Sequence, residues 1–231
     1  MILRDRVLDA LSGVRDPELD EPITDLDFVS SLEVENGAAM VHLRLPTYFC
    51  APNFAYLMVA DAQAAALSVP GIERAVVYLD DHYASEEING GVNESRGFDG
   101  AFEGETEGPD LEELRTTFHR KGFVSRQEQL CRTFLAAGRS PLELAQMSLA
   151  DLPPSDEFET YLERRAELGI DVSAEAPFVV DPDGERVPEE AVVQHLRFAK
   201  TVRVSIEGNA GLCRGLLSTR YGTPEREEKT A

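Results

Sequence analysis

The sequence is poor in cysteine and in basic residues. It has 3 cysteines, and 22 lysines and arginines against 43 aspartates and glutamates, in 231 residues. The resulting net charge of −21 repels phosphate backbones, so we expect no binding to nucleic acid. An odd, low number of cysteines does not describe the disulfide framework of a secreted domain, which favours reduced thiols in a cytoplasmic protein.

Long apolar runs are also missing. No stretch approaches the roughly 18 apolar residues of a membrane-spanning helix, and residues 1–6 lack the charged-then-apolar layout of a secretory signal. We therefore expect no membrane association. Hydrophobic residues still make up 42% of the sequence, which is enough for a packed core in one large domain or two small ones.

The first 80 residues predict a small α+β layer. The predicted elements, in order, are a helix over Leu3–Leu11, strands over Phe28–Glu35 and Ala38–Leu45, a helix over 52–67 and a strand over Ile72–Leu79. Asn36-Gly37 joins the first two strands, because both residues tolerate the positive φ of a type I′ turn. A helix between the second and third strands implies that these two pair in parallel.

The turn before the second predicted helix carries Cys50. Pro52 suits the first helical turn, where its missing N–H would be unpaired anyway. Cys50 therefore lies just ahead of a helix N-terminus, where free N–H groups and the helix dipole lower the pKa of a thiol. Two interpretations stay open: a reactive or metal-binding sulfur, or a small buried hydrophobe, which is what most free cysteines are.

Short motifs along residues 1–82 resemble one known family. The motifs, in order, are Asp16-Pro17-Glu18, Ile23-Thr24-Asp25-Leu26, a hairpin, Thr47-x-x-Cys50 opening a helix, and Pro70-Gly71-Ile72 before a strand. In this order they resemble the family that contains SufT, PaaD and the cytosolic iron–sulfur targeting factor MIP-eighteen. The chain departs from the family pattern at Asp27, at Ala51, which separates Cys50 from Pro52, and at the bulky pair Tyr48-Phe49.

This resemblance implies a role in assembling iron–sulfur clusters or in delivering them to target proteins. It places the family's reactive or ligand position at Cys50, in the turn that Thr47 opens. It places the family's acidic motif at Asp16 and Glu18. The implied partner is a cluster-assembly protein or a client metalloenzyme. An oxygenase is one candidate for this client.

The end of the third predicted strand supplies further candidates. Asp81 and His82 lie at the strand edge where sites form in α/β proteins. His82 is either a ligand or proton carrier beside Cys50, or a polar surface residue. His42 falls on the solvent face of its strand, which favours a surface residue over a ligand.

The second half of the chain predicts a separate, mainly helical part. We expect an N-terminal domain over residues 1–108 that ends in an acidic, glycine-rich linker or lid, a helical domain over 109–222, and a disordered tail over 223–231. The expected elements are helices over 111–121, 124–137, 141–149, 158–168 and 189–199, a hairpin over 178–187, a strand over 202–206 and a last element over 209–221. Residues 135–149 could pass for a helix-turn-helix, but the acidic charge favours an ordinary helix pair.

The other two cysteines differ in their surroundings. Cys131 follows Leu130 in an apolar helical pattern, which favours packing over chemistry. Cys213 follows the predicted turn Gly208–Gly211 near a helix start. It could be a second sulfur ligand if the C-terminal part folds back on the first domain.

No closely spaced cysteine pair, His-x-x-x-His or phosphate-binding glycine loop occurs. With three cysteines, an iron–sulfur cluster or iron would need a non-cysteine ligand, an open position or Cys50 of a second subunit in a homodimer. Such an incomplete site suits transient transfer, so the preferred hypothesis is an assembly or delivery factor with Cys50, Cys213 and His82 as candidate ligands. Two alternatives stay open: an enzyme with Cys50 as nucleophile and His82 as its base, and an interaction scaffold without cysteine chemistry.

Overall fold

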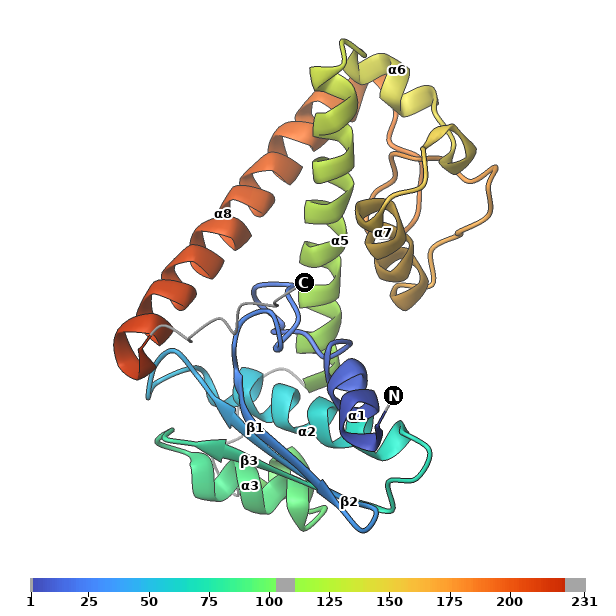
Figure 1. Ribbon diagram of the computed structural model, residues 1–231. Coiled ribbons are helices and arrows are strands. Elements are labelled where there is room, and N and C mark those ends of the chain that lie inside the picture. The colour runs from blue at the N-terminus through green and yellow to red at the C-terminus, as the bar shows by residue number, and fades with distance from the viewer. Residues whose placement is uncertain (1, 103–110, 223–231) are drawn as a thin grey trace, which may run out of the picture. The chain divides into compact units, whose positions relative to one another are not determined.

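The computed structural model describes residues 2–102 and 111–222 (Figure 1). The chain divides into two compact units. Unit 1 comprises residues 1–111 and 209–231, and unit 2 comprises residues 112–208. The sequence-based division at residue 108 assigns residues 209–222 to the second domain, whereas in the structure they group with the N-terminal one. The predicted tail over 223–231 lies outside the described residues, as does the second half of the predicted linker, over 103–110.

Unit 1 has the predicted α+β architecture. Its elements are α1 Leu3–Leu11, β1 Val29–Glu35, β2 Ala38–Arg44, α2 Pro52–Ser68, β3 Arg74–Asp80, α3 Ser85–Asn93 and α4 Gly97–Ala101. The strands form one sheet in the order β1-β2-β3, in which β1 is antiparallel and β3 parallel to β2. Asn36 and Gly37 join β1 to β2 with φ angles of 48° and 75°, so the predicted turn and the predicted parallel pairing are both confirmed.

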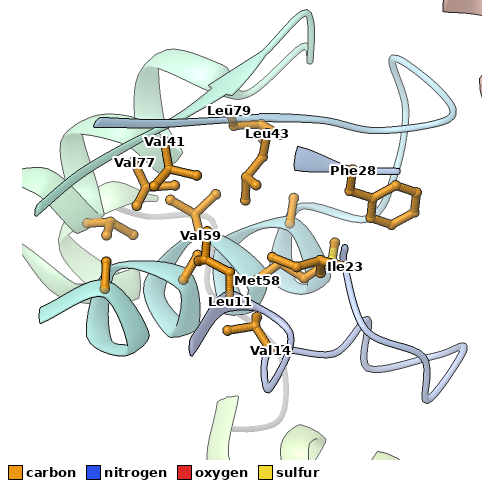
Figure 2. Close-up of a cluster of buried hydrophobic side chains, with 14 of the residues drawn as sticks. Leu11, Val14, Ile23, Phe28, Val41, Leu43, Met58, Val59, Val77 and Leu79 are labelled. Carbon is orange, nitrogen blue, oxygen red and sulfur yellow. The ribbon is translucent and has the colours of Figure 1, made fainter. Parts of the chain in front are cut away.

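One face of the sheet forms the core of unit 1. Alternate residues of β2 and β3 are buried, among them Val41 and Val77, while Met40 and Tyr78 on the opposite face are 41% and 36% exposed. Figure 2 shows the buried side chains of both strands directed toward Val59 and Met58 of α2. Burying one face of a sheet against a helix in this way removes apolar surface from water, which is the main stabilising contribution to the fold.

Two asparagines of α3 bond to the backbone of β3. Asn89 accepts from the N–H of Leu79 (2.8 Å) and donates to its carbonyl (3.2 Å). Asn93 makes the same pair of bonds with Val77, at 3.1 and 2.8 Å. These backbone groups point away from β2, so α3 satisfies the outer side of β3 with side-chain amides.

Unit 2 is built from helices and irregular segments. Its elements are α5 Leu111–Ala136, α6 Pro141–Gln146, a 3₁₀ turn over Leu149–Asp151, α7 Asp156–Glu167 and the first part of α8 Glu189–Tyr221. Ser140 caps α6 and Glu143 completes the reciprocal capping pair, as the Ser-Pro-x-Glu sequence predicts. The mainly helical character of this part is therefore confirmed.

Four local predictions in the second half are wrong. The two helices expected on either side of Gly122 are one helix, α5, because Gly122 is buried and packing outweighs the cost of about 1 kcal/mol for a glycine in a helix. The strand over 202–206 is helical and belongs to α8, as does the predicted turn before Cys213. The hairpin over 178–187 reduces to a turn with a single bridge between Val180 and Arg186.

A chain of buried polar side chains runs through the interior of unit 2. The side-chain N–H of Gln127 on α5 donates to the hydroxyl of Tyr161 on α7 (2.9 Å), and its side-chain oxygen accepts from Nε2 of His195 on α8 (2.8 Å). The guanidinium of Arg165 donates to the carbonyl of Pro177 (2.9 Å). Arg203 of α8 pairs with Glu128 of α5, with both side chains below 10% exposed. These bonds connect α5, α7 and α8 within the unit.

Candidate functional site

Cys50 lies in the turn that connects β2 to α2. Ala51 is the N-cap of α2 and Pro52 its first residue, as predicted. Cys50 and Thr47 are half-buried in this turn. The proline fixes the start of the helix, so the position of the thiol relative to the sheet depends on a short, constrained segment.

The last part of α8, within unit 1, packs beside this turn. The side-chain amide of Asn209 donates to Glu18 (3.2 Å), and Arg214 pairs with Glu21. Arg220 donates to the carbonyls of Leu45 (3.1 Å) and Asp81 (2.6 Å). These contacts join α8 to the acidic N-terminal motif and to the segments on either side of Cys50.

Cys213 lies on the face of α8 that makes these contacts. It follows Asn209 by four residues and precedes Leu217, which is buried in the core of unit 1, by four. Residues four apart share one face of a helix. Cys50 and Cys213 both pack against that core. The sequence placed Cys213 near a helix start, whereas it lies well inside a long helix.

The pKa of Cys50 is raised to about 12, mainly because the thiol is buried, and further because the charges of Asp16, Cys213 and Glu18 lie close. The N–H of Ala51 favours the thiolate, but its effect is smaller. The prediction that the helix N-terminus lowers this pKa is therefore wrong, since desolvation and negative neighbours outweigh the helix dipole. Burial and the charges of Asp16 and Glu18 also raise the pKa of Cys213.

Asp16 organises the acidic motif of the family resemblance. Its carboxylate accepts from the N–H groups of Glu18 (2.8 Å) and Leu19 (2.9 Å), which closes a tight turn. The side chain is buried, and burial raises its pKa to about 6 despite these two bonds. Asp16, Glu18, Cys50 and Cys213 thus form a cluster of neighbouring acidic and sulfur groups.

His82 bonds to the backbone on both sides of its ring. Its Nδ1 accepts from the N–H of Ala84 (3.2 Å), so its Nε2 carries the proton and donates to the carbonyl of Cys50 (2.7 Å). Burial lowers the pKa of His82, which favours this neutral form. The sequence left open whether His82 lies beside Cys50 or on the surface. The structure buries it next to Cys50 and directs it to the cysteine's backbone and not to its sulfur.

The remaining candidates lie around this centre or away from it. Asp81 is exposed, and its carboxylate accepts from Tyr221 (3.2 Å) and pairs with Arg220 (2.5 Å). His42 pairs with Asp80 across β2 and β3 (3.0 Å). Cys131 is fully buried in the core of unit 2, in agreement with a packing role.

Within residues 2–102 and 111–222, no three His, Cys, Asp or Glu side chains are arranged to hold a metal ion. The cluster around Cys50 therefore offers two sulfurs with acidic neighbours, but no complete coordination shell. The sequence could not indicate that Cys213 joins Cys50, because that depends on α8 continuing as a helix through Gly208 and Gly211.

Comparison with protein families gives a match to the N-terminal part. Residues 4–78 match the family model for iron–sulfur cluster assembly proteins. The match confirms the resemblance found in the motifs, and it runs from α1 into β3, with Asp16 and Cys50 inside it. His82 and Cys213 lie outside it.

Two further comparisons gave no match: neither a curated protein nor a solved structure is similar to the chain. None of the helices in the described ranges is long and apolar enough to cross a membrane. The family match supports a general role in iron–sulfur cluster assembly, and it does not extend into unit 2.

Proposed function

We propose that this protein is a cytoplasmic assembly or delivery factor that holds an iron–sulfur cluster or iron transiently through Cys50, with Cys213 as the second sulfur. Cargo passes to or from a cluster-assembly protein or a client metalloenzyme, and an oxygenase is one such client. The observation that carries the proposal is the approach of Cys213, on α8, to the family's cysteine position in unit 1.

The electrostatics of the cluster support cationic cargo. Cysteine binds metals as the thiolate, and here each thiolate is disfavoured by burial and by Asp16 and Glu18. Iron bound between the sulfurs would compensate these negative charges, so cargo binding and thiol deprotonation occur together. Without cargo the thiols stay protonated.

The incomplete ligand set supports transient binding. Two sulfurs leave coordination positions that the partner, a small thiol or Cys50 of a second subunit can fill. A ligand from the partner allows cargo to pass between the proteins without becoming free. A homodimer that shares a cluster between two copies of the site is the symmetric version of this arrangement.

The alternative of an enzyme with Cys50 as nucleophile has less support from the structure. A nucleophile needs a base within hydrogen-bond reach, and the ring nitrogens of His82 bond to Cys50 O and Ala84 N. The raised pKa of Cys50 also keeps its thiol protonated at neutral pH. The scaffold alternative requires no cysteine chemistry and is tested by the same experiment as the main proposal.

The test is reconstitution with ferrous iron and sulfide under anaerobic conditions, followed by iron and sulfide analysis and visible absorption. We expect the wild type to hold iron, Cys50→Ala to lose it, and Cys213→Ala to retain less than half. Cys131→Ala is the matched control, because this cysteine belongs to the core of unit 2, and it should match the wild type. Transfer to an apo-ferredoxin then measures delivery.

Two outcomes would contradict the proposal. Iron content that survives in Cys50→Ala would move the site elsewhere. A wild type that stays empty after reconstitution, with a Cys50→Ala variant that is silent in cells, would favour the scaffold.

A further inference from the structure

Three aromatic side chains beside Cys50 are exposed to solvent. Tyr48, Phe49 and Tyr83 are 44%, 77% and 50% exposed. The rings of Tyr48 and Phe49 meet edge to face at 5.2 Å between centroids, and Tyr48 lies 6.3 Å from Tyr83. Exposed aromatic side chains that gather in this way mark interaction sites more often than single exposed apolar residues do. We call these three residues the aromatic cluster.

The aromatic cluster is held in shape by the backbone. It comes from two segments, and the N–H of Tyr83 donates to the carbonyl of Tyr48 (3.2 Å). The His82 ring lies 4.9 Å from that of Tyr83 and donates to the carbonyl of Cys50. The rings are therefore preorganised, which lowers the entropy lost when a partner covers them.

The position of the aromatic cluster connects it to the cargo site. Phe49 directly precedes Cys50, and Tyr83 directly follows the histidine that holds the Cys50 carbonyl. A protein that covers these rings would lie against the turn that carries Cys50. Exchange of a cluster or an iron ion needs this proximity, because donor and acceptor ligands must both reach the cargo.

The charge around the aromatic cluster limits what can bind it. Glu86 and Glu87 are exposed in the first turn of α3, three and four residues after Tyr83. The chain as a whole carries a net charge of −21. A basic surface is attracted and steered by this field, whereas an anionic membrane is repelled.

We propose that the aromatic cluster is the docking site for the protein that exchanges cargo with Cys50, and that this protein presents an apolar pocket bordered by lysine and arginine. The inference rests on the proposed function, since it names the chemistry of that partner. Phe49 is the central anchor, because it is the most exposed of the three rings. Glu86 and Glu87 supply the acidic rim.

The test is photo-crosslinking of the full-length protein in the cells that produce it, with benzoylphenylalanine in place of Phe49. Phe198 is the matched control, because it is also an exposed phenylalanine (62%) but belongs to unit 2. We expect a crosslink to one identified protein from position 49 and not from position 198. The crosslinked peptide should contain lysine or arginine beside apolar residues.

Binding of that purified protein then gives the magnitude. We expect F49S to weaken binding at least tenfold, which is typical for loss of an aromatic anchor. The double variant Glu86→Lys/Glu87→Lys should slow association, most strongly at low salt. Cys50→Ala should still dock while losing cargo, so failure of docking and failure of the cargo proposal can be told apart.

The inference is overturned if position 49 crosslinks to nothing, to lipid or to the same proteins as position 198. A crosslink only to another copy of this chain would make the aromatic cluster a dimer interface instead. Binding that F49S and the charge reversal leave unchanged would also overturn it.

Discussion

Buried polar side chains have different partners in the two units. In unit 1, Asp16 and His82 bond to backbone atoms of turns, and those turns lie next to Cys50. In unit 2, Gln127 bonds to side chains of two other helices as well as to a backbone carbonyl, and Arg203 pairs with glutamates of its own and of another helix. The comparison indicates that buried polarity shapes a site in unit 1, whereas in unit 2 it specifies how the helices pack.

Breaking the buried ion pair between Arg203 and Glu128 should have the largest effect on stability. Arg203→Met leaves the carboxylate of Glu128 buried without its partner, so we expect unit 2 to lose about 3–5 kcal/mol of stability. Urea unfolding with hydrogen exchange resolved by residue would measure this loss in each unit. The double variant Arg203→Met/Glu128→Met removes both charges and should recover most of it. A loss below about 1 kcal/mol in the single variant would contradict a buried pair.

Neutralising Asp16 should raise the stability of unit 1, in contrast to the loss expected for Arg203→Met in unit 2. Its pKa rises from 3.8 to about 6 on folding, so the folded state binds the proton more tightly than the unfolded state. The stability that protonated Asp16 contributes to unit 1 is fully present below pH 4 and is lost as the pH rises from about 4 to 6. At neutral pH the buried carboxylate destabilises unit 1. Asp16→Asn keeps an oxygen for the N–H groups of Glu18 and Leu19.

We therefore expect Asp16→Asn to be more stable than the wild type at pH 7.5, by on the order of 2–3 kcal/mol. The difference should disappear below pH 4. Thermal unfolding across pH 3.5–8 would measure it. A variant that is less stable than the wild type at pH 7.5 would show that the charged form serves the turn.

Variants of His82 test whether its buried bond to the turn controls how reactive the Cys50 thiol is. His82→Ala leaves the carbonyl of Cys50 without its buried donor, which costs about 1–3 kcal/mol, and frees the turn. We expect faster alkylation of Cys50 by iodoacetamide, followed by mass spectrometry, with Cys131 as the internal control. His82→Gln supplies an amide donor and should restore the slow rate. Equal alkylation rates in all three proteins would show that His82 does not affect the reactivity of Cys50.

The smallest expected effect concerns α8 near Cys213. Gly211 is helical and has open space where a side chain would begin, so Gly211→Ala should stabilise unit 1 by up to about 1 kcal/mol. Thermal unfolding would detect the change, and Gly138→Ala provides a contrast. Gly138 has a φ of +93°, so alanine there should destabilise unit 2. Destabilisation by Gly211→Ala would contradict a continuous helix at this position.

Much of unit 1 could be predicted from the sequence, because its signals are local. Alternating apolar residues, Asn36-Gly37 and Pro52 each fix an element within a few residues of themselves. Unit 2 was harder, since packing decides against local preference. Val202, Val204 and Ile206 alternate as in a strand, yet the buried positions are Val192, Leu196, Ala199 and Arg203, which follow the period of a helix.

The site was predictable in its first sulfur and not in its second. Cys50 and Asp16 belong to motifs that lie within one domain. The approach of Cys213 depends on a helix that continues through Gly208, where the sequence predicted a turn. The bonds of His82 to the backbone carry no sequence signal, because they depend on how the end of β3 meets the turn before α2.

The asparagines of α3 have a consequence for how other proteins approach unit 1. An outermost strand with free N–H and carbonyl groups can accept a strand from another molecule, in binding or in aggregation. Asn89 and Asn93 are about 6 Å apart along their helix, close to the spacing of about 6.6 Å between Val77 and Leu79 along β3. The two amides occupy the place of a fourth strand, so the sheet cannot extend at β3. A protein that binds on this side of unit 1 must therefore be recognised through side-chain contacts and not by adding a strand.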